Sequence, residues 1–216
     1  MIPKILNDVA EIISNEKIRI SKAIEGESRV ASLVDEGTVI RFLLTTNLSK
    51  YILSEKPRKF GDMIVLDYDG KTEYVVNIKT SIGSSDNATS KIGFLYAFTD
   101  MQVHELPIQM NWKKFWELIK SRKADIPNKD YWYLCVDKTD SSNVTIRGSK
   151  QINSWVENIN PANLLQINWK KEKSLPPKIQ TYDESYEVIV NGIVRCIAKG
   201  INNLPKEWKE TIRETI

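Results

Sequence analysis

One stretch of the chain decides the fold: Asp62-Met-Ile-Val-Leu-Asp-Tyr-Asp-Gly-Lys-Thr-Glu-Tyr-Val-Val-Asn-Ile-Lys79. It contains two β-rich runs, residues 63–66 and 74–79, on either side of an Asp-Gly pair at positions 69 and 70. An Asp-Gly pair between two such runs is typical of a tight turn between antiparallel strands. The stretch therefore predicts a β-hairpin.

The position of the turn also predicts which residues face each other. A turn centred between Asp69 and Gly70 pairs residues whose numbers sum to 139, so Asp62 lies opposite Asn77 with Cβ atoms roughly 5 Å apart. Side chains alternate along a strand, so Lys79 projects from the same face as Asn77. A four-residue turn keeps this register, whereas an odd-length loop or a bulge would send every side chain to the other face.

These three side chains have the chemistry that phosphodiester hydrolysis needs. Asp62 can bind a divalent cation, Asn77 offers a second oxygen ligand, and Lys79 can lie near an attacking water. Such a cation neutralises charge that develops on phosphate and makes a better nucleophile. The spacing alone fits a structural interpretation better, in which Asp62 belongs to a turn and Lys79 is a charge at a strand end.

The rest of the chain reads as a succession of helices and strands. Periodicity predicts helices at residues 3–22, 30–53, 111–121 and 206–216, strands at 131–137, 166–169 and 185–190, a polar loop at 82–90 and a helical or irregular segment at 91–100. This order predicts an α/β (α+β) fold with a mixed central sheet flanked by helices. The length of 216 residues suits a single domain.

Composition and charge limit the function classes. The net charge is only +3, so a nucleic-acid site must be a local basic patch. The single histidine, His104, cannot supply a His-metal nuclease motif, and neither a P-loop nor a dinucleotide-binding fingerprint is present. Cys135 and Cys196 lie in apolar stretches without CxxC spacing, which indicates buried reduced thiols and no zinc site.

The start of the chain and its apolar runs bear on location. The N-terminal residues show no basic segment followed by an apolar one, and no apolar run approaches membrane-spanning length. We therefore expect a soluble cytoplasmic protein without a membrane partner.

Asp62, followed after the hairpin by Asn77-Ile78-Lys79, resembles the motif of the PD-(D/E)XK nucleases. Three further segments, residues 80–96, 131–137 and 160–169, are similar in order and spacing to the blunt-cutting type II restriction enzymes of the EcoRV and HincII kind. Only scattered residues match. The resemblance implies a restriction-endonuclease-like fold and Mg²⁺-dependent hydrolysis of double-stranded DNA at a specific short site, palindromic in sequence.

The resemblance also implies roles for individual residues. Asp62 would be the bridging metal ligand, Asn77 would occupy the second ligand position, and Lys79 would position or activate the water. Glu36 would be a helix-borne acid, although a glutamate at a helix start is explained equally well by the helix macrodipole. Mg²⁺ is the only cofactor implied.

Asn77 departs from the family pattern, which has Asp or Glu at this position. A neutral amide oxygen in place of an anionic ligand should lower the affinity for metal. Three explanations remain open: a natural variant in which another acid compensates, a deliberate inactivating substitution, or a misplaced motif.

Specific cleavage also needs residues that contact DNA bases and phosphates. Two segments supply them, namely the loop after the hairpin with Ser85, Asn87, Thr89 and Lys91, and the segment that resembles a recognition strand with Asn168 as a base reader and Lys170, Lys171 and Lys173 beside the backbone. Trp169 is more simply explained by core packing.

These assignments divide the single domain of residues 1–216 into three parts. Residues 1–55 form N-terminal helices, residues 60–137 the catalytic core, and residues 138–216 the DNA-recognition strands and a C-terminal helix. Cutting both strands of a palindrome calls for a C₂ homodimer, whose interface the N-terminal helices could form. The alternatives are a structure-selective repair or recombination nuclease and a catalytically inactive DNA-binding protein on the same scaffold.

Overall fold

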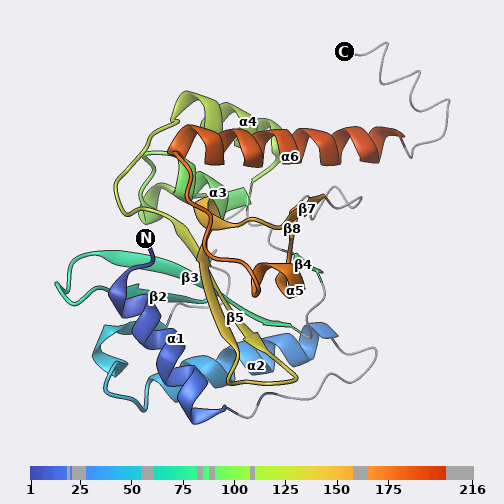
Figure 1. Cartoon of the computed structure of the whole chain (residues 1–216). Coiled ribbons are helices and arrows are strands. Elements are labelled where there is room, and N and C mark those ends of the chain that lie inside the picture. The colour runs from blue at the N-terminus through green and yellow to red at the C-terminus, as the bar shows by residue number, and fades with distance from the viewer. Residues whose placement is uncertain are drawn as a thin grey trace.

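A mixed five-stranded sheet runs through the centre of the computed structural model (Figure 1). The structure describes residues 1–18, 20, 28–54, 61–81, 85–87, 91–107, 110–157 and 165–202. In spatial order the strands are β1 (Ile52–Ser54), β2 (Met63–Leu66), β3 (Glu73–Ser81), β5 (Tyr131–Asp137) and β6 (Val144–Gly148). The β3–β5 pair is parallel and the other three pairs are antiparallel. The predicted α/β fold with a mixed sheet is therefore confirmed.

A smaller antiparallel sheet and several helices complete the domain. The small sheet has the order β4 (Ser85–Asn87), β8 (Leu165–Asn168), β7 (Trp155–Glu157). The α-helices are α1 (Lys4–Glu16), α2 (Ser28–Leu43), α3 (Lys91–Phe98), α4 (Trp112–Ser121), α5 (Trp169–Glu172) and α6 (Tyr182–Asn202), and short 3₁₀ helices are η1 (Ser49–Tyr51), η2 (Val103–Glu105) and η3 (Ser149–Gln151).

Strands β2 and β3 form the predicted hairpin in the predicted register. Met63 pairs with Val76, which gives the expected sum of 139. The Asp67 amide donates to the Thr72 carbonyl oxygen at 2.8 Å and closes the turn. Gly70 has a φ of 66°, a left-handed conformation that glycine adopts without steric cost. The turn residues therefore set the register on which the site depends.

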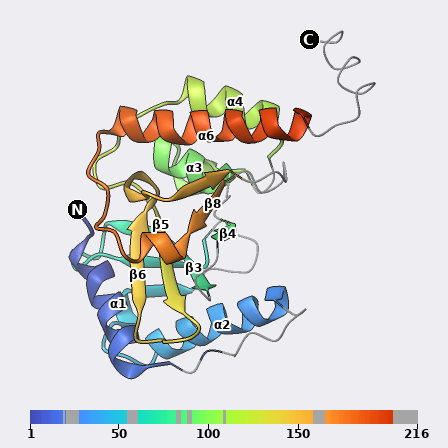
Figure 2. The same cartoon turned by 45° about the vertical axis from the view of Figure 1, so that its right-hand side comes forward.

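Alternation along the strands builds two cores on opposite faces of the sheet. On β2, Met63 and Val65 pack with α1 and α2, whereas Ile64 packs with α3, α4 and α6. On β3, Val76 belongs to the core beside α1 and α2, which we call the first core. Val75 belongs to the core beside α3, α4 and α6, which we call the second core. Figures 1 and 2 show α1 and α2 on one side of the sheet and α3, α4 and α6 on the other. Because side chains alternate, Asn77 and Lys79 lie on the face of Val75.

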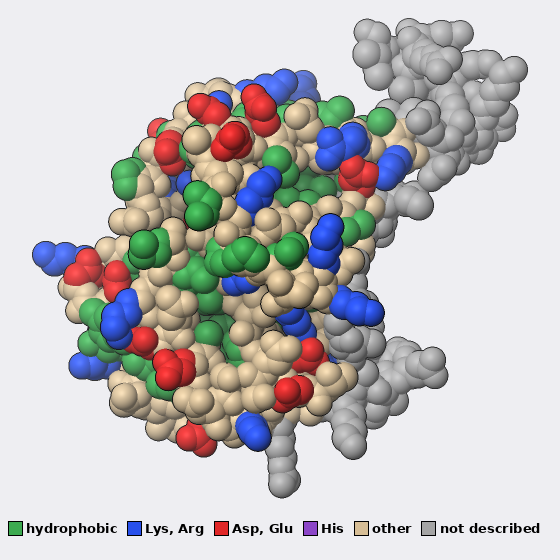
Figure 3. All heavy atoms as spheres, viewed as in Figure 1, with side chains coloured by type: hydrophobic (Ala, Val, Ile, Leu, Met, Phe, Trp, Pro, Cys, Tyr) green, Lys and Arg blue, Asp and Glu red, His purple; other side chains and the backbone are tan. Residues whose placement is uncertain are grey.

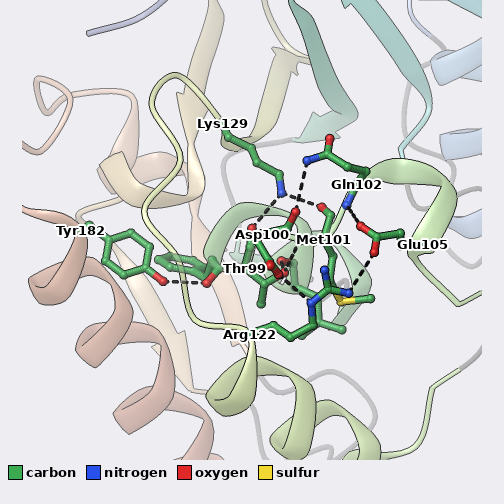
Figure 4. A network of polar contacts seen from close by, with 10 residues as sticks. Thr99, Asp100, Met101, Gln102, Glu105, Arg122, Lys129 and Tyr182 are labelled. Carbon is green, nitrogen blue, oxygen red and sulfur yellow. Dashed lines mark hydrogen bonds and ion pairs between the residues drawn. The ribbon is translucent and has the colours of Figure 1, made fainter.

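A polar network fastens the crossover that leads from β3 to the parallel strand β5 (Figure 4). The Lys129 ammonium, just before β5, donates to the carbonyl oxygens of Thr99 at 2.8 Å and Met101 at 2.6 Å. Burial lowers the pKa of Lys129 to about 8. The Arg122 guanidinium binds Asp100 at 2.7 Å nearby. These contacts join the segment after α3 to the start of β5.

The strand predicted at residues 185–190 is wrong, because these residues belong to α6. The run Val-Ile-Val is β-branched and favours a strand locally. Burial at Ile189, Ile193 and Cys196 follows a helical period instead, so packing against the second core overrides the local preference. The helix predicted at 206–216 lies outside the described residues.

The two predicted N-terminal helices end earlier than expected, and two other predicted elements are confirmed. The first helix ends at Glu16, where Lys17 takes a left-handed conformation with φ of 47°, and the second ends at Leu43. The predicted helix at 111–121 and strand at 131–137 are confirmed. Trp169 is fully buried, which confirms its role in the core.

Both cysteines behave as predicted: each is buried, and neither belongs to a disulfide. Among the described residues, no helix combines the length and the apolar character needed to cross a membrane.

Candidate active site on the β2–β3 hairpin

Asp62 immediately precedes β2 and is held against β3 by two hydrogen bonds. Its amide donates to the Val76 carbonyl oxygen at 2.9 Å, which continues the ladder of the hairpin. Its carboxylate Oδ2 accepts from the amide of Ile78 at 2.6 Å. Extending the register by one pair places Asp62 opposite Asn77, as predicted. The side chain is thus fixed in orientation by the backbone of β3.

Gly61 explains how the chain can approach β3 so closely at this point. A Cβ atom at this position would lie 2.5 Å from Val75 Cγ1 and 3.3 Å from the Val76 carbonyl oxygen. Only a residue without a side chain avoids these contacts. Gly61 therefore allows the backbone to deliver Asp62 to the hairpin.

Gly61→Ala should destabilise the fold by overpacking. We expect the free energy of unfolding to fall by about 1–3 kcal/mol, measured by urea denaturation. Gly37→Ala is the matched control, because a Cβ atom there meets only the flexible side chain of Arg41, at 3.3 Å. Equal stability of Gly61→Ala and the wild type would contradict the close approach.

Asn77 and Lys79 lie on the same face of β3, between the buried residues Val75 and Ser81. Their side chains are partly exposed, whereas Val75, two residues earlier on the same face, is buried beneath the second core. Ile78 between them is fully buried on the opposite face. Their neighbours on β5, Tyr133 and Cys135, are also buried, so Asn77 and Lys79 are partly exposed between buried residues.

Three effects act on the pKa of Asp62. Burial raises the pKa, while the hydrogen bond from the Ile78 amide and the charge of Lys79 lower it, and the net result is a raised pKa. Burial disfavours the charged form of a carboxylate, so a nearby cation would stabilise it. Burial therefore dominates over the hydrogen bond and the lysine charge at Asp62.

The raised pKa of Asp62 predicts how stability depends on pH. The native state binds more protons than the unfolded state between the two pKa values, so stability falls as pH rises through that range. In EDTA we expect Asp62→Asn to unfold at a higher temperature than the wild type at pH 7, with the difference lost near pH 3. Circular dichroism at both pH values measures this, and equal midpoints at pH 7 would refute it.

The oxygen donors of Asp62 and Asn77 suit Mg²⁺. This ion prefers hard oxygen ligands and is often held by one or two carboxylates, with waters and substrate phosphate completing its shell. Across the described part of the chain, no group of three or more His, Cys, Asp or Glu side chains could hold a metal ion. Asp62 and Asn77 together offer one carboxylate and one neutral amide oxygen, and a neutral oxygen attracts a divalent cation less strongly than an anionic one.

Glu36 lies on α2, which packs on the face of the sheet opposite Asn77 and Lys79, and its side chain is partly exposed. Its neighbour Asp35 is the buried acid, 1% exposed, and its carboxylate lies 2.8 Å from the Lys138 ammonium. The sequence carries a signal for this, because the apolar residues Val39 and Leu43 are four positions apart, and the same spacing extended backwards falls on position 35, which is buried in the structure. That phase places Asp35, and not Glu36, on the buried side of the helix.

The two segments predicted separately to bind DNA are hydrogen-bonded neighbours. Strand β4 pairs with β8, so that Ser85 lies opposite Asn168 and Asn87 opposite Gln166. Figure 2 shows both strands beside the carboxyl end of β3. Nonlocal pairing thus joins the loop after the hairpin to the predicted recognition strand.

Asn168 also caps helix α5. Its side-chain oxygen accepts from the Lys171 amide at 3.1 Å, so the helix cap uses the oxygen of the side chain and not its NH₂ group. Lys170 and Lys171 are exposed, and Figure 3 shows Lys and Arg side chains gathered on the surface over α5. Lys173 differs from them because its ammonium pairs with Asp137 at 2.6 Å.

Two predicted DNA contacts remain, Lys91 and Thr89. Lys91 begins α3, and its ammonium lies 4.5 Å from the ring centroid of Trp112, a cation–π contact. Burial lowers the pKa of Lys91. Thr89 lies outside the described residues.

A large cavity of about 830 Å³ lies elsewhere, at the amino end of β5. Its lining includes Trp132 and the buried Asp130, whose pKa burial raises to about 6. None of the predicted site residues lines it.

No protein-family model matches the chain, and no curated protein matches it. Its function is therefore inferred from the geometry and chemistry of its residues.

Proposed function

We propose that this chain is a type II restriction endonuclease, which hydrolyses phosphodiester bonds in double-stranded DNA at a specific short site with the help of Mg²⁺. The observation that carries this proposal is the register of the hairpin. It places Asp62 opposite Asn77, with Lys79 on the same face of β3, and both Asn77 and Lys79 are partly exposed.

Each of the three side chains has a distinct role in this proposal. Asp62 and Asn77 would hold Mg²⁺, which when bound supplies neutralisation of phosphate charge and a more acidic water. The hydrogen bond from Ile78 keeps the Asp62 carboxylate in one orientation. Lys79, whose charge already acts on Asp62, orients the attacking water and stabilises negative charge next to it.

The small sheet would present the DNA-reading residues. Three residues separate the end of β3 from the start of β4, and β4 pairs with β8, so the position of the small sheet is tied to the strand that carries Lys79. Asn168 would read a base edge in a groove, and Lys170 would contact backbone phosphate. The local basic surface over α5 supports this assignment despite the small net charge (Figure 3).

A homodimer would bring two such sites to the two strands of a palindrome. The apolar stripe of α1, including Val9 and Ile13, is buried against the sheet and is not free for a partner. Residues 1–55 also expose Val34, Leu44 and Leu53, at 54%, 43% and 43%. We propose that these three side chains form the dimer interface. We also propose that the protein acts in the cytoplasm.

Asn77 favours a second candidate function, a DNA-binding protein that does not cut. The amide removes one anionic ligand, and among the described residues no group of three or more His, Cys, Asp or Glu side chains could hold a metal ion. The DNA-reading segments would still operate in such a protein, because they do not depend on metal.

Digestion of supercoiled plasmid with Mg²⁺, followed by sequencing of the ends, tests the proposal. A restriction endonuclease gives double-strand ends at one short repeated sequence. Scattered nicks or cuts at structural features would indicate a structure-selective nuclease instead. Tight binding without cuts, over a range of Mg²⁺ concentrations, would favour the non-cutting DNA-binding protein.

A further inference from the structure

Two consecutive residues, Asp137 and Lys138, lie where the parallel strands β3 and β5 end. Asp137 is the last residue of β5 and pairs with Ser81, the last residue of β3. The Lys138 amide donates to the Ser81 carbonyl oxygen at 3.0 Å. This junction lies two residues beyond Lys79 on β3.

Asp137 and Lys138 form ion pairs to two different layers of the fold. The Lys138 ammonium lies 2.8 Å from a carboxylate oxygen of Asp35 on α2, which belongs to the first core. The Asp137 carboxylate lies 2.6 Å from the Lys173 ammonium, directly after α5 and Trp169 of the second core. The sheet end is therefore held from both faces.

Both ion pairs are shielded from solvent, unlike most surface pairs. The side-chain exposures are 8% and 1% for Lys138 and Asp35, and 10% and 13% for Lys173 and Asp137. Asp137 also accepts two hydrogen bonds from Thr139, from its amide at 2.8 Å and its hydroxyl at 2.6 Å. Shielded and multiply bonded charges are held in one geometry much more firmly than exposed ones.

We propose that Asp137 and Lys138 act as positioning residues, which hold α2 and α5 at the end of β3 and so set the catalytic hairpin relative to the DNA-reading segment. This inference rests on the proposed nuclease function. The pair Asp137–Lys173 is the part that connects catalysis to recognition, because Lys173 lies only five residues after Asn168.

A closed series of contacts links β3 to the DNA-reading segment and back. Ser81 of β3 pairs with Asp137, whose carboxylate binds Lys173 after α5. Helix α5 is preceded directly by Asn168 of β8, which pairs with Ser85 of β4. Three residues separate β4 from the end of β3, so the series of contacts ends where it began, at Ser81. A base contact at Asn168 is thereby linked to the position of the strand that carries Lys79.

Lys173→Met tests the proposal, because it removes the cation without leaving the more deeply buried Asp35 unpaired. We expect the single-turnover rate of DNA cleavage at saturating enzyme to fall by about 100-fold, as for a small misplacement of reacting groups. DNA affinity and its salt dependence should change little, because Lys173 is already neutralised by Asp137. Lys173→Arg keeps the charge and should restore most of the rate.

Lys123→Met is the matched control, since it removes an ion pair of the same length, 2.6 Å to Asp183, that is exposed and distant from the hairpin. Its cleavage rate should equal that of the wild type. A wild-type rate in Lys173→Met would overturn the proposal. So would an unchanged rate at saturation with weaker binding and a salt slope reduced by about one, because that pattern marks a phosphate contact.

Hydrogen–deuterium exchange separates failure of this proposal from failure of the nuclease function. We expect the amides of residues 78–81 to exchange faster in Lys173→Met than in Lys123→Met. If the wild type does not cut DNA, the nuclease function fails, and faster exchange still supports the positioning role. Unchanged exchange at residues 78–81 would overturn that role in either case.

Discussion

Replacing Lys79 by alanine is expected to lower the rate of DNA cleavage by about a thousandfold, within the range that a single positioned proton-transfer group contributes. Lys79 is partly exposed on β3, and its charge acts on the Asp62 carboxylate. Without it, the attacking water loses its orienting group and the developing negative charge loses a counter-charge. Single-turnover cleavage of a short duplex measures the rate, and a binding assay in EDTA measures affinity, which should stay largely intact.

Lys71→Ala supplies the matched control for this variant. Lys71 is an exposed lysine of the same hairpin, at the turn and away from Asp62, so its loss should leave the rate unchanged. Full activity of Lys79→Ala would contradict a catalytic role for Lys79. An equal loss in Lys71→Ala would show that the effect is a general one of positive charge.

Asn77→Asp should lower the Mg²⁺ concentration needed for half-maximal cleavage by at least about tenfold, equivalent to about 1.4 kcal/mol of binding free energy. The hairpin register places residue 77 opposite Asp62, so the variant adds a second carboxylate where the wild type has a neutral amide. An additional anionic ligand raises the affinity of an oxygen site for a divalent cation. Cleavage measured across a Mg²⁺ titration provides the readout.

The same variant should be less stable than the wild type in EDTA. Two facing carboxylates repel, so the pKa of Asp62 should rise further, and Mg²⁺ should restore the lost stability. Asn143→Asp, an exposed substitution of the same kind in the turn after β5, should show no dependence on Mg²⁺. An unchanged Mg²⁺ titration for Asn77→Asp would indicate that residue 77 does not contact the metal.

The hairpin could be predicted from sequence because its information is local. The Asp-Gly turn and the alternation of side chains set the register between Met63 and Val76 without help from the rest of the chain. The amphipathic helix α4 could be predicted for the same reason, since its buried Phe115 and Ile119 follow one helical period.

The features that were not predicted from the sequence depend instead on contacts between distant parts of the chain. The β-branched residues 188–190 favour a strand, yet the second core holds them in α6. The pairing of β4 with β8 joins segments about eighty positions apart, and neither strand is long enough to show a period of its own. Ion pairs such as Asp35–Lys138 exist only once the fold has formed, so a charge pattern could not reveal them.

The most direct test of the central claim compares plasmid cleavage by the wild type and Asp62→Asn, in Mg²⁺ and in EDTA. Asp62→Asn is the sharpest variant, because it keeps the shape of the side chain that the Ile78 amide binds and removes only its charge. We predict that the wild type cleaves in Mg²⁺ and not in EDTA, and that Asp62→Asn cleaves in neither. Cleavage by the wild type in EDTA, or by Asp62→Asn in Mg²⁺, would contradict the assignment of Asp62, Asn77 and Lys79 as a metal-dependent site.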